Sequence, residues 1–175
     1  LKHLEMLPLR EATIHKHKEA EQMLFNIQMF KGELTEEQYL AHLNQQLAIY
    51  DAIESKGLPS PTLSRVNEVQ EDIDELVAKG CTSKELTDST KRYTTYLDTL
   101  DSEGILPHVY INYLGIMFGG QIMKKNVPSS GKMYNFENKK EAIQAVRDVQ
   151  KDEWADEVNK AYDYIIDIFR DLETA

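Results

Sequence analysis

The feature that most constrains this chain is the helical spacing of its apolar residues, which continues through long uninterrupted stretches. Runs with the strict alternation of a β-strand are almost absent, and the five prolines and eight glycines gather between the stretches. A first stripe starts at Leu9 and recurs at steps of three and four: Thr13, His17, Ala20, Leu24 and Ile27. The pattern predicts one helix from Leu9 to near Gly32 and an all-α fold for the whole chain.

Further helices are predicted along the rest of the chain. Thr35 and Gln38 have the form of a capping box, and a second helix runs from there to Gly57. Helices over residues 63–80, 86–100 and 106–125 follow, and residues 136–173 fit one long helix or a broken pair. No internal repeat or interdomain linker interrupts residues 1–175, so we expect a single-domain bundle of about six to seven helices.

Composition excludes several classes of protein. The 175 residues are 41% hydrophobic and 29% charged, as in a globular domain with one core, and the net charge of −10 without a basic run argues against a nucleic-acid partner. The single cysteine, Cys81, rules out an internal disulfide and favours a reducing compartment, the cytoplasm. No apolar run reaches the length of a membrane span, and we expect a soluble monomer that does not bind a membrane.

Histidine is the first candidate for chemistry, and the chain has five: His3, His15, His17, His42 and His108. Only His17 lies on the inward stripe, whereas His15 points about 200° away from it, toward solvent. Glu21 follows His17 by one helical turn, so its carboxylate can accept the Nδ1 proton and leave Nε2 free to bind a metal. A buried histidine with a purely structural hydrogen bond would show the same spacing, and both interpretations stay open.

Glycines inside the stretch 106–125 are the second candidate. Gly115 and Gly119 are one turn apart on one face, with Gly120 beside them, although each interior glycine costs about 0.5–1 kcal/mol relative to alanine. Their absence of side chains permits either tight helix packing or close approach of a flat ligand. A glycine-lined helix opposite an inward histidine is what a planar metal macrocycle requires.

Other catalytic sites lack the residues they need. The chain has no Glu-x-x-His pair for a di-metal bundle site and no glycine-rich phosphate loop or dinucleotide fingerprint. Cys81 follows Gly80 at a helix end, where nothing nearby would activate a thiol.

Two segments resemble the signatures of heme oxygenases. Residues 9–13, Leu-Arg-Glu-Ala-Thr, with His17, Ala20 and Glu21 resemble the proximal helix of that family. Residues 108–115, His-Val-Tyr-Ile-Asn-Tyr-Leu-Gly, with Gly-Gly-Gln-Ile-Met-Lys-Lys at 119–125 resemble its distal helix. The resemblance implies a bundle with heme held between these helices, and a reaction in which dioxygen and electrons convert heme, both cofactor and substrate, to biliverdin, carbon monoxide and ferrous iron.

The resemblance also implies roles for single residues. His17 would be the axial iron ligand, oriented by Glu21, and the glycines at 115, 119 and 120 would let the distal helix lie over the heme. The other positions that match the heme contacts are Arg10, Thr13, Tyr110 and Arg147, of which Arg10, Tyr110 and Arg147 match propionate-binding positions. An ordinary solvated helix charge is the alternative for Arg147.

The distal segment departs from the family at two positions. Ile116 follows Gly115, where heme oxygenases usually carry an aspartate that anchors the distal water network, and Asn112 replaces a common arginine. Isoleucine neither accepts nor relays a proton, so another group (Asn112, Tyr113 or Gln121) holds the water, or the chain binds heme without degrading it efficiently. The alternatives to an oxygenase are therefore a heme carrier or sensor, or a helical scaffold that has kept only the motifs.

Electrons must come from outside, because the chain has no flavin or iron–sulfur motif. Seven lysines flank the two segments, and a small acidic donor such as ferredoxin, or a reductase, could dock there; solubilising lysines are the alternative. The lysines are Lys16, Lys18, Lys124, Lys125, Lys132, Lys139 and Lys140.

Overall fold

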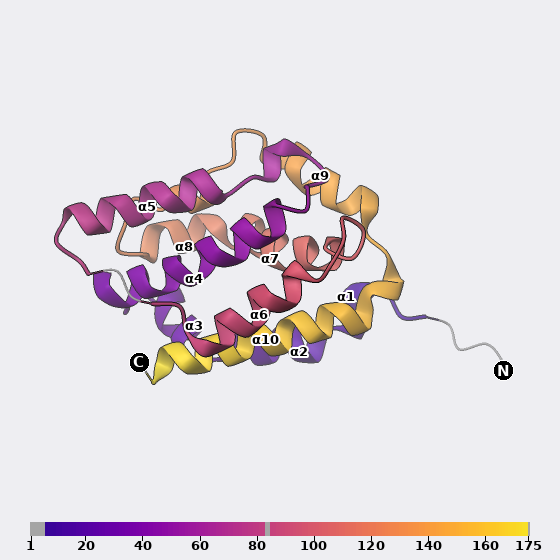
Figure 1. Ribbon diagram of the computed structural model, residues 1–175, viewed down its shortest axis with the longest axis horizontal. Helices are drawn as coiled ribbons and strands as arrows, with labels where there is room; N and C mark the ends of the chain where they lie inside the picture. The colour runs from indigo at the N-terminus through magenta and orange to yellow at the C-terminus, as the bar shows by residue number, and fades with distance from the viewer. Residues whose placement is uncertain (1–5, 83–84, 175) are drawn as a thin grey trace.

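The computed structural model describes residues 6–82 and 85–174, and every regular element in that part of the chain is a helix (Figure 1). The α-helices are α1 (Leu9–Ala12), α2 (Ile14–Glu21), α3 (Leu24–Phe30), α4 (Glu36–Glu54), α5 (Val66–Ala78), α6 (Asp88–Asp98), α7 (Leu106–Phe118), α8 (Gly120–Asn126), α9 (Lys139–Val149) and α10 (Ala155–Glu173). Short 3-10 turns cover Pro61–Leu63, Lys132–Tyr134 and Asp152–Trp154. The all-α prediction is confirmed.

Helix α10 organises the bundle. It packs against α2, α3, α6 and α7, while α4 packs against α5 and α6 on the other side of the core (Figure 1). Tyr39, Tyr50, Tyr93 and Tyr113 are fully buried between these layers. Helices α2 and α7, which contain most of the two segments singled out in the sequence, therefore pack against the same helix, α10.

The predicted first helix is broken twice, which corrects the expectation of one helix from Leu9 to Gly32. At Thr13 the side-chain hydroxyl donates to the Leu9 carbonyl at 2.9 Å, a contact that bends helices, and α2 starts at the next residue. Met23 is extended, with ψ 137°, and the amide of Phe25, in the first turn of α3, donates to Glu173 Oε2 at 3.0 Å. The second break thus depends on a carboxylate 148 positions away.

The predicted helix over 106–125 is also divided, into α7 and α8 at Gly119. Two hydrogen bonds nearly continue the helix, from Gly119 N to Gly115 O at 3.0 Å and from Met123 N to Gly119 O at 3.2 Å. The interruption is therefore a bend. These breaks raise the number of α-helices in the described residues above the six to seven expected. The Thr35–Gln38 capping box of α4 is as predicted. Of the two alternatives for residues 136–173, the structure has the broken pair, α9 and α10.

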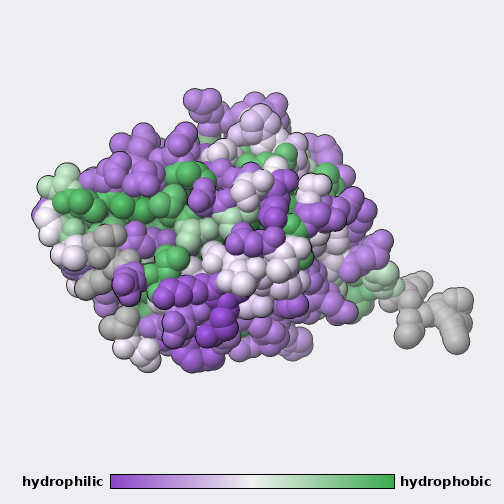
Figure 2. Space-filling model, viewed as in Figure 1, coloured by the Kyte–Doolittle hydropathy of each residue, from purple (hydrophilic) through white to green (hydrophobic). Residues whose placement is uncertain are grey.

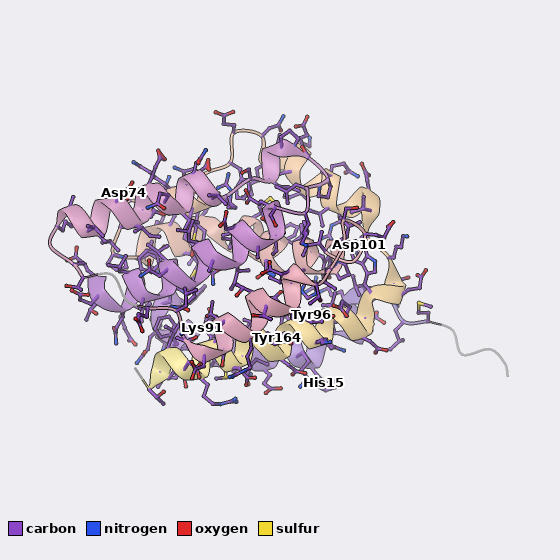
Figure 3. The ribbon with its side chains drawn as sticks, viewed as in Figure 1. His15, Asp74, Lys91, Tyr96, Asp101 and Tyr164 are labelled. Atoms are coloured by element: carbon purple, nitrogen blue, oxygen red, sulfur yellow. The ribbon has the colours of Figure 1, made fainter. Side chains whose placement is uncertain are left out.

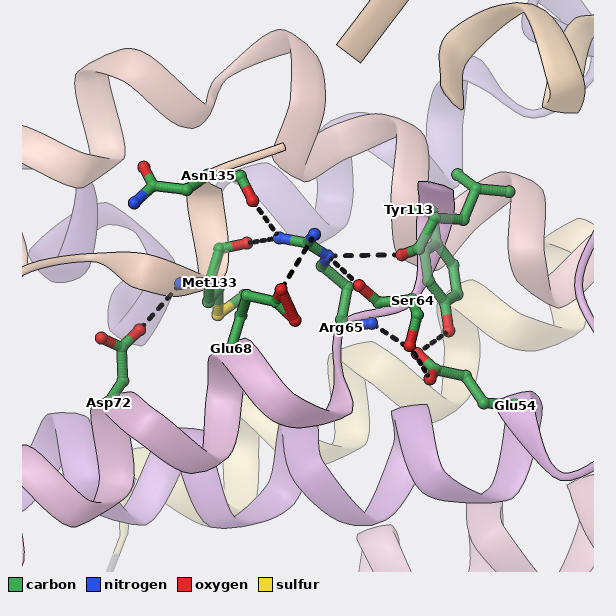
Figure 4. Close-up of polar contacts among 9 residues, drawn as sticks. Glu54, Ser64, Arg65, Glu68, Asp72, Tyr113, Met133 and Asn135 are labelled. Atoms are coloured by element: carbon green, nitrogen blue, oxygen red, sulfur yellow. Dashed lines mark hydrogen bonds and ion pairs between the residues drawn. The ribbon is translucent and has the colours of Figure 1, made fainter. Parts of the chain in front are cut away.

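Arg65 directly precedes α5 and is only 3% exposed. It forms hydrogen bonds both with the turn before α9 and with Glu54 at the end of α4 (Figure 4). Its Nη1 donates to the carbonyls of Met133 at 2.9 Å and Asn135 at 2.7 Å, and its guanidinium lies 3.6 Å from the centre of the Phe136 ring. A buried guanidinium is tolerated when its donors are satisfied in this way.

Glu54 extends the same cluster to the distal helix (Figure 4). Its carboxylate accepts the Arg65 amide at 2.7 Å, the Ser64 hydroxyl at 2.7 Å and the Tyr113 hydroxyl at 2.9 Å. Since Tyr113 lies on α7, this cluster fixes the position of the helix that carries the glycines.

The viewed face of the molecule is mostly hydrophilic, in keeping with the net charge of −10, with an apolar band interrupting it (Figure 2). Large apolar side chains that stay exposed are Met6, Leu7, Leu24, Phe30, Val77, Phe118 and Ile122. Within residues 6–82 and 85–174, no helix combines the length and apolar character needed to cross a membrane.

His42 on α4 gives the fold a defined sensitivity to acid. It is buried beside the rings of Phe25, Tyr39 and Phe169, and its Nδ1 has no hydrogen-bond partner among residues 6–82 and 85–174. Burial lowers its pKa from 6.5 to about 4. Between those pH values the unfolded chain binds a proton that the folded chain does not, so stability falls as pH falls. We expect a loss of about 3 kcal/mol in total from this residue.

Urea unfolding of the parent and of His42→Phe at pH 7, 5.5 and 4.5 measures this loss. The free energy of unfolding of the parent should fall more steeply on acidification than that of the variant, in which no imidazole can be protonated. Parallel pH dependences in the two proteins would contradict the assignment.

Candidate functional site

His17 on α2 faces α10. Its side chain is 42% exposed, Nδ1 lies 2.9 Å from the Tyr162 hydroxyl of α10, and Nε2 lies 3.2 Å from Glu21 Oε2. His15 is exposed at the edge of the bundle, as predicted (Figure 3), and His3 lies outside the described residues. The imidazole of His17 thus contacts side chains from two helices, α2 and α10, and is still open to solvent.

The pairing of the imidazole nitrogens differs from the prediction. Glu21 contacts Nε2 and not Nδ1, and Nε2 is therefore not free in this conformer. Tyr162 occupies Nδ1, a contact between positions 145 residues apart that helical spacing could not reveal. Thr13 is buried and its hydroxyl bonds the Leu9 carbonyl, so its side chain shapes the bend between α1 and α2.

The glycines of α7 and α8 divide into two kinds. A Cβ atom added at Gly115 would meet nothing within 4 Å, and at Gly119 it would meet only the Gly115 carbonyl at 3.5 Å. At Gly120 it would meet the Tyr134 ring at 3.4 Å, so this buried glycine serves helix packing. Of the two interpretations, packing applies to Gly120, whereas Gly115 and Gly119 leave an open face, beside which Phe118 is 61% exposed.

Two arginines lie near Tyr110 of α7. Burial raises the pKa of Tyr110, and the positive charges of Arg147 and Arg10 partly offset that rise, which places both guanidiniums near the phenol. Arg147 also lies 5.5 Å from the centre of the Phe118 ring and donates to Gln150 Oε1 at 2.8 Å. The tertiary structure thus brings together Arg10, Tyr110 and Arg147, which are separated in sequence.

Tyr162 of α10 lies between Tyr110 and His17. Burial raises its pKa, and the electrostatic influence of Tyr110 and Glu21 raises it further. Its hydroxyl already contacts His17. Sequence reasoning missed Tyr162, and its only signal was a place on the long helical stripe that ends the chain.

Asn112 lies on α7 one turn before Ile116 and is 9% exposed. Its Nδ2 donates to the Tyr93 hydroxyl at 3.0 Å and to the His108 carbonyl at 2.9 Å. Ile116 is partly buried against the core. The Tyr113 hydroxyl is engaged by Glu54, and Gln121 is exposed on α8, beyond the bend.

A single half-exposed histidine fits a metal that brings most of its own ligands. In the described part of the chain, no three His, Cys, Asp or Glu side chains come together to hold a bare metal ion. A macrocycle supplies four nitrogens and needs only an axial ligand and a flat space. His17 offers the first, and the Gly115 face offers the second.

The match to a known family decides the relationship. A family model described as heme oxygenase matches residues 6–171. The chain belongs to the heme oxygenase family. Bovine heme oxygenase 1 is 33% identical over 147 residues, which cover 70% of this chain and 50% of the bovine protein. The chain thus spans about half the length of that curated heme oxygenase.

Solved structures of heme oxygenases share the fold. Heme oxygenase-1 of the cyanobacterium Synechocystis, solved with heme, matches with a TM-score of 0.78 at 22% identity, over 95% of this chain and 90% of that one. Heme oxygenase of Leptospira interrogans matches with a TM-score of 0.77 at 25% identity, over 92% of this chain and 96% of that one. The predicted heme oxygenase fold is confirmed.

Proposed function

We propose that this chain is a heme oxygenase that binds heme between α2 and α7 and uses dioxygen and electrons to convert it to biliverdin, carbon monoxide and ferrous iron. The observation that carries the proposal is the half-exposed His17, braced by Glu21 and Tyr162, in a family member whose α7 leaves an open glycine face. Heme, when bound, is both the substrate and the centre at which dioxygen is activated.

His17 supplies the axial nitrogen in this proposal. Both ring nitrogens have partners, so one contact must be released, and the contact between Nε2 and Glu21 is the longer of the two. With Nε2 released to bind the iron, the Nδ1–H can donate to the Tyr162 hydroxyl, which fixes the tautomer and keeps the bound nitrogen basic.

Arg10, Tyr110 and Arg147 are suited to the heme propionates. Two guanidiniums near one phenol form charge-assisted hydrogen bonds with carboxylates, which are stronger than neutral ones. If these three residues hold the propionates, they set the orientation of the macrocycle within its own plane. That orientation decides which edge of the macrocycle is oxidised.

The face of α7 supplies close approach and exclusion of water. Gly115 and Gly119 let the backbone lie near a flat ligand, and exposed Phe118 lends apolar surface to its edge. Ile116 adds a side chain that excludes water without binding it.

We also propose that a small acidic protein such as ferredoxin, or a reductase, delivers the electrons. The lysines that flank the site support docking, except that Lys16 is engaged by Asp163 at 2.7 Å and Lys124 by Asn135 at 2.6 Å. The donor, the monomeric state and the cytoplasmic location stay predictions.

A single-turnover spectrum tests the activity. One equivalent of hemin is bound, a ferredoxin reducing system is added in air, and the Soret and bilin bands are followed. Loss of the Soret band with formation of biliverdin is the expected result. A Soret band that persists would instead identify a heme carrier or sensor, the alternative that Ile116 raises.

A further inference from the structure

A buried line of polar side chains runs from the glycine helix to the surface. Asn112 Nδ2 lies 3.0 Å from the Tyr93 hydroxyl, which lies 2.7 Å from His108 Nδ1. His108 Nε2 in turn lies 2.8 Å from Glu157 Oε2. Tyr93 and His108 are fully buried, whereas Glu157 on α10 is 30% exposed. Four side chains from α6, α7 and α10 thus form one hydrogen-bonded chain.

The direction of these hydrogen bonds follows from the outer end. Burial acts to raise the pKa of Glu157, but hydrogen bonds from Tyr96 and His108 outweigh it and lower that pKa, and the Lys160 ammonium nearby adds to this. Burial lowers the pKa of His108. The pair is therefore a carboxylate and a neutral imidazole. Figure 3 shows Tyr96 on α6 beside Tyr164 on α10.

A neutral His108 that donates from Nε2 to Glu157 must accept at Nδ1. Among the residues that the structure describes, the Tyr93 hydroxyl is the one that can donate a proton there, so the Tyr93 oxygen is left to accept from Asn112. The second partner of Asn112, the His108 carbonyl, is also an acceptor. Only the amide NH2 can satisfy both, and this fixes which way the Asn112 side chain is turned.

The side-chain oxygen of Asn112, Oδ1, consequently points away from Tyr93 and the His108 carbonyl. Asn112 Oδ1 makes no hydrogen bond with a described residue. It is also absent from the set of fully buried, unpartnered side-chain atoms in the described residues, so this oxygen keeps some accessible surface. Around α7, Asn112 stands about 60° from Gly115 and about 40° from Ile116. The free acceptor therefore lies at the margin of the open glycine face.

We propose that Asn112 Oδ1 is the acceptor that holds water over the bound heme, in place of the aspartate expected where this chain has Ile116, and that Tyr93, His108 and Glu157 are positioning residues that orient it. This inference rests on the proposed function. An amide oxygen accepts a hydrogen bond but does not ionise near neutral pH. Asn112 therefore holds the water without exchanging a proton of its own, unlike a carboxylate.

Alkaline titration of the ferric heme complex tests the acceptor. Water donates a stronger hydrogen bond than hydroxide does, so an acceptor above the heme raises the pH at which the spectrum changes to its alkaline form. Loss of that acceptor in Asn112→Leu should lower the midpoint by about 0.5–1 pH unit. Asn112→Asp, which adds a negative charge at the same place, should raise it. An unchanged midpoint in both variants would overturn the proposal.

Tyr93→Phe and Tyr96→Phe form a matched pair for the positioning role. Both remove a hydroxyl from α6 in contact with the His108–Glu157 pair, but only Tyr93 contacts Asn112. Tyr93→Phe should lower the midpoint in the direction of Asn112→Leu, and Tyr96→Phe should leave it within about 0.2 pH unit of the parent. Equal shifts in the two variants would refute the positioning role.

The heme-free protein provides a measurement that is independent of the proposed function. Both Nδ2 protons of Asn112 are donated, so their exchange with solvent, followed by NMR, should be slow in the parent and in Tyr96→Phe and about tenfold faster or more in Tyr93→Phe. Fast exchange in the parent would overturn the inference even if heme binds. Failure to bind heme, with slow exchange retained, would instead overturn the proposed function and, with it, the role of Oδ1 in holding water.

Discussion

Replacing His17 with alanine is expected to abolish the axial nitrogen coordination of bound heme. The described residues offer no cluster of other metal-ligating side chains at this site, and removing even an outer partner of a metal ligand typically costs about 10–100-fold in affinity. We expect heme affinity to fall at least about 100-fold, with loss of the Soret spectrum of a histidine complex. Absorption titration with hemin measures both quantities.

His15→Ala is the matched control. His15 lies two positions away on the same helix, is exposed, and has the same side chain, so its loss should leave the titration unchanged. Thermal unfolding of both variants without heme checks that α2 is intact. A His17→Ala protein that keeps the parent spectrum would show that another residue holds the iron.

Replacing Gly115 with leucine is expected to stabilise the protein and to block heme binding. A side chain at this position meets open space, and leucine is more favourable than glycine in a helix by about 0.5–1 kcal/mol, which should raise the melting temperature of the heme-free protein by about 1–4 °C. The same side chain would occupy the space proposed for the macrocycle, and we expect affinity for hemin to fall at least about 100-fold, equivalent to about 2.7 kcal/mol.

Gly120→Leu should have the opposite effect on stability. A Cβ there already touches the Tyr134 ring, so a leucine overpacks the core and should cost about 1–3 kcal/mol. Calorimetry of the two variants, with and without hemin, separates the packing glycine from the open one. A Gly115→Leu protein that binds hemin as the parent does would place the heme elsewhere.

Opposite effects on stability and binding would identify α7 as a helix that keeps a destabilising residue for its ligand. Residues at binding sites commonly sacrifice stability in this way. The glycines of α7 and α8 were grouped together in the sequence, and their separation into two roles required the position of Tyr134.

The sequence by itself determined the helical class, the capped start of α4 and the two segments from which the proposed heme site is built. These features are local, since hydrophobic period, capping residues and glycine spacing act within a few turns. The one-turn spacing of His17 and Glu21 is of the same kind, and their contact is present in the structure.

Only the tertiary structure decided where helices break, which nitrogen of His17 meets Glu21, and how Asn112 is turned. The break before α3 depends on Glu173, the imidazole on Tyr162, and the amide on Tyr93, partners that lie 148, 145 and 19 positions away. Side-chain hydrogen bonds of this length in sequence form only after the helices pack. No local pattern could predict them, because each is selected by the shape of the assembled bundle.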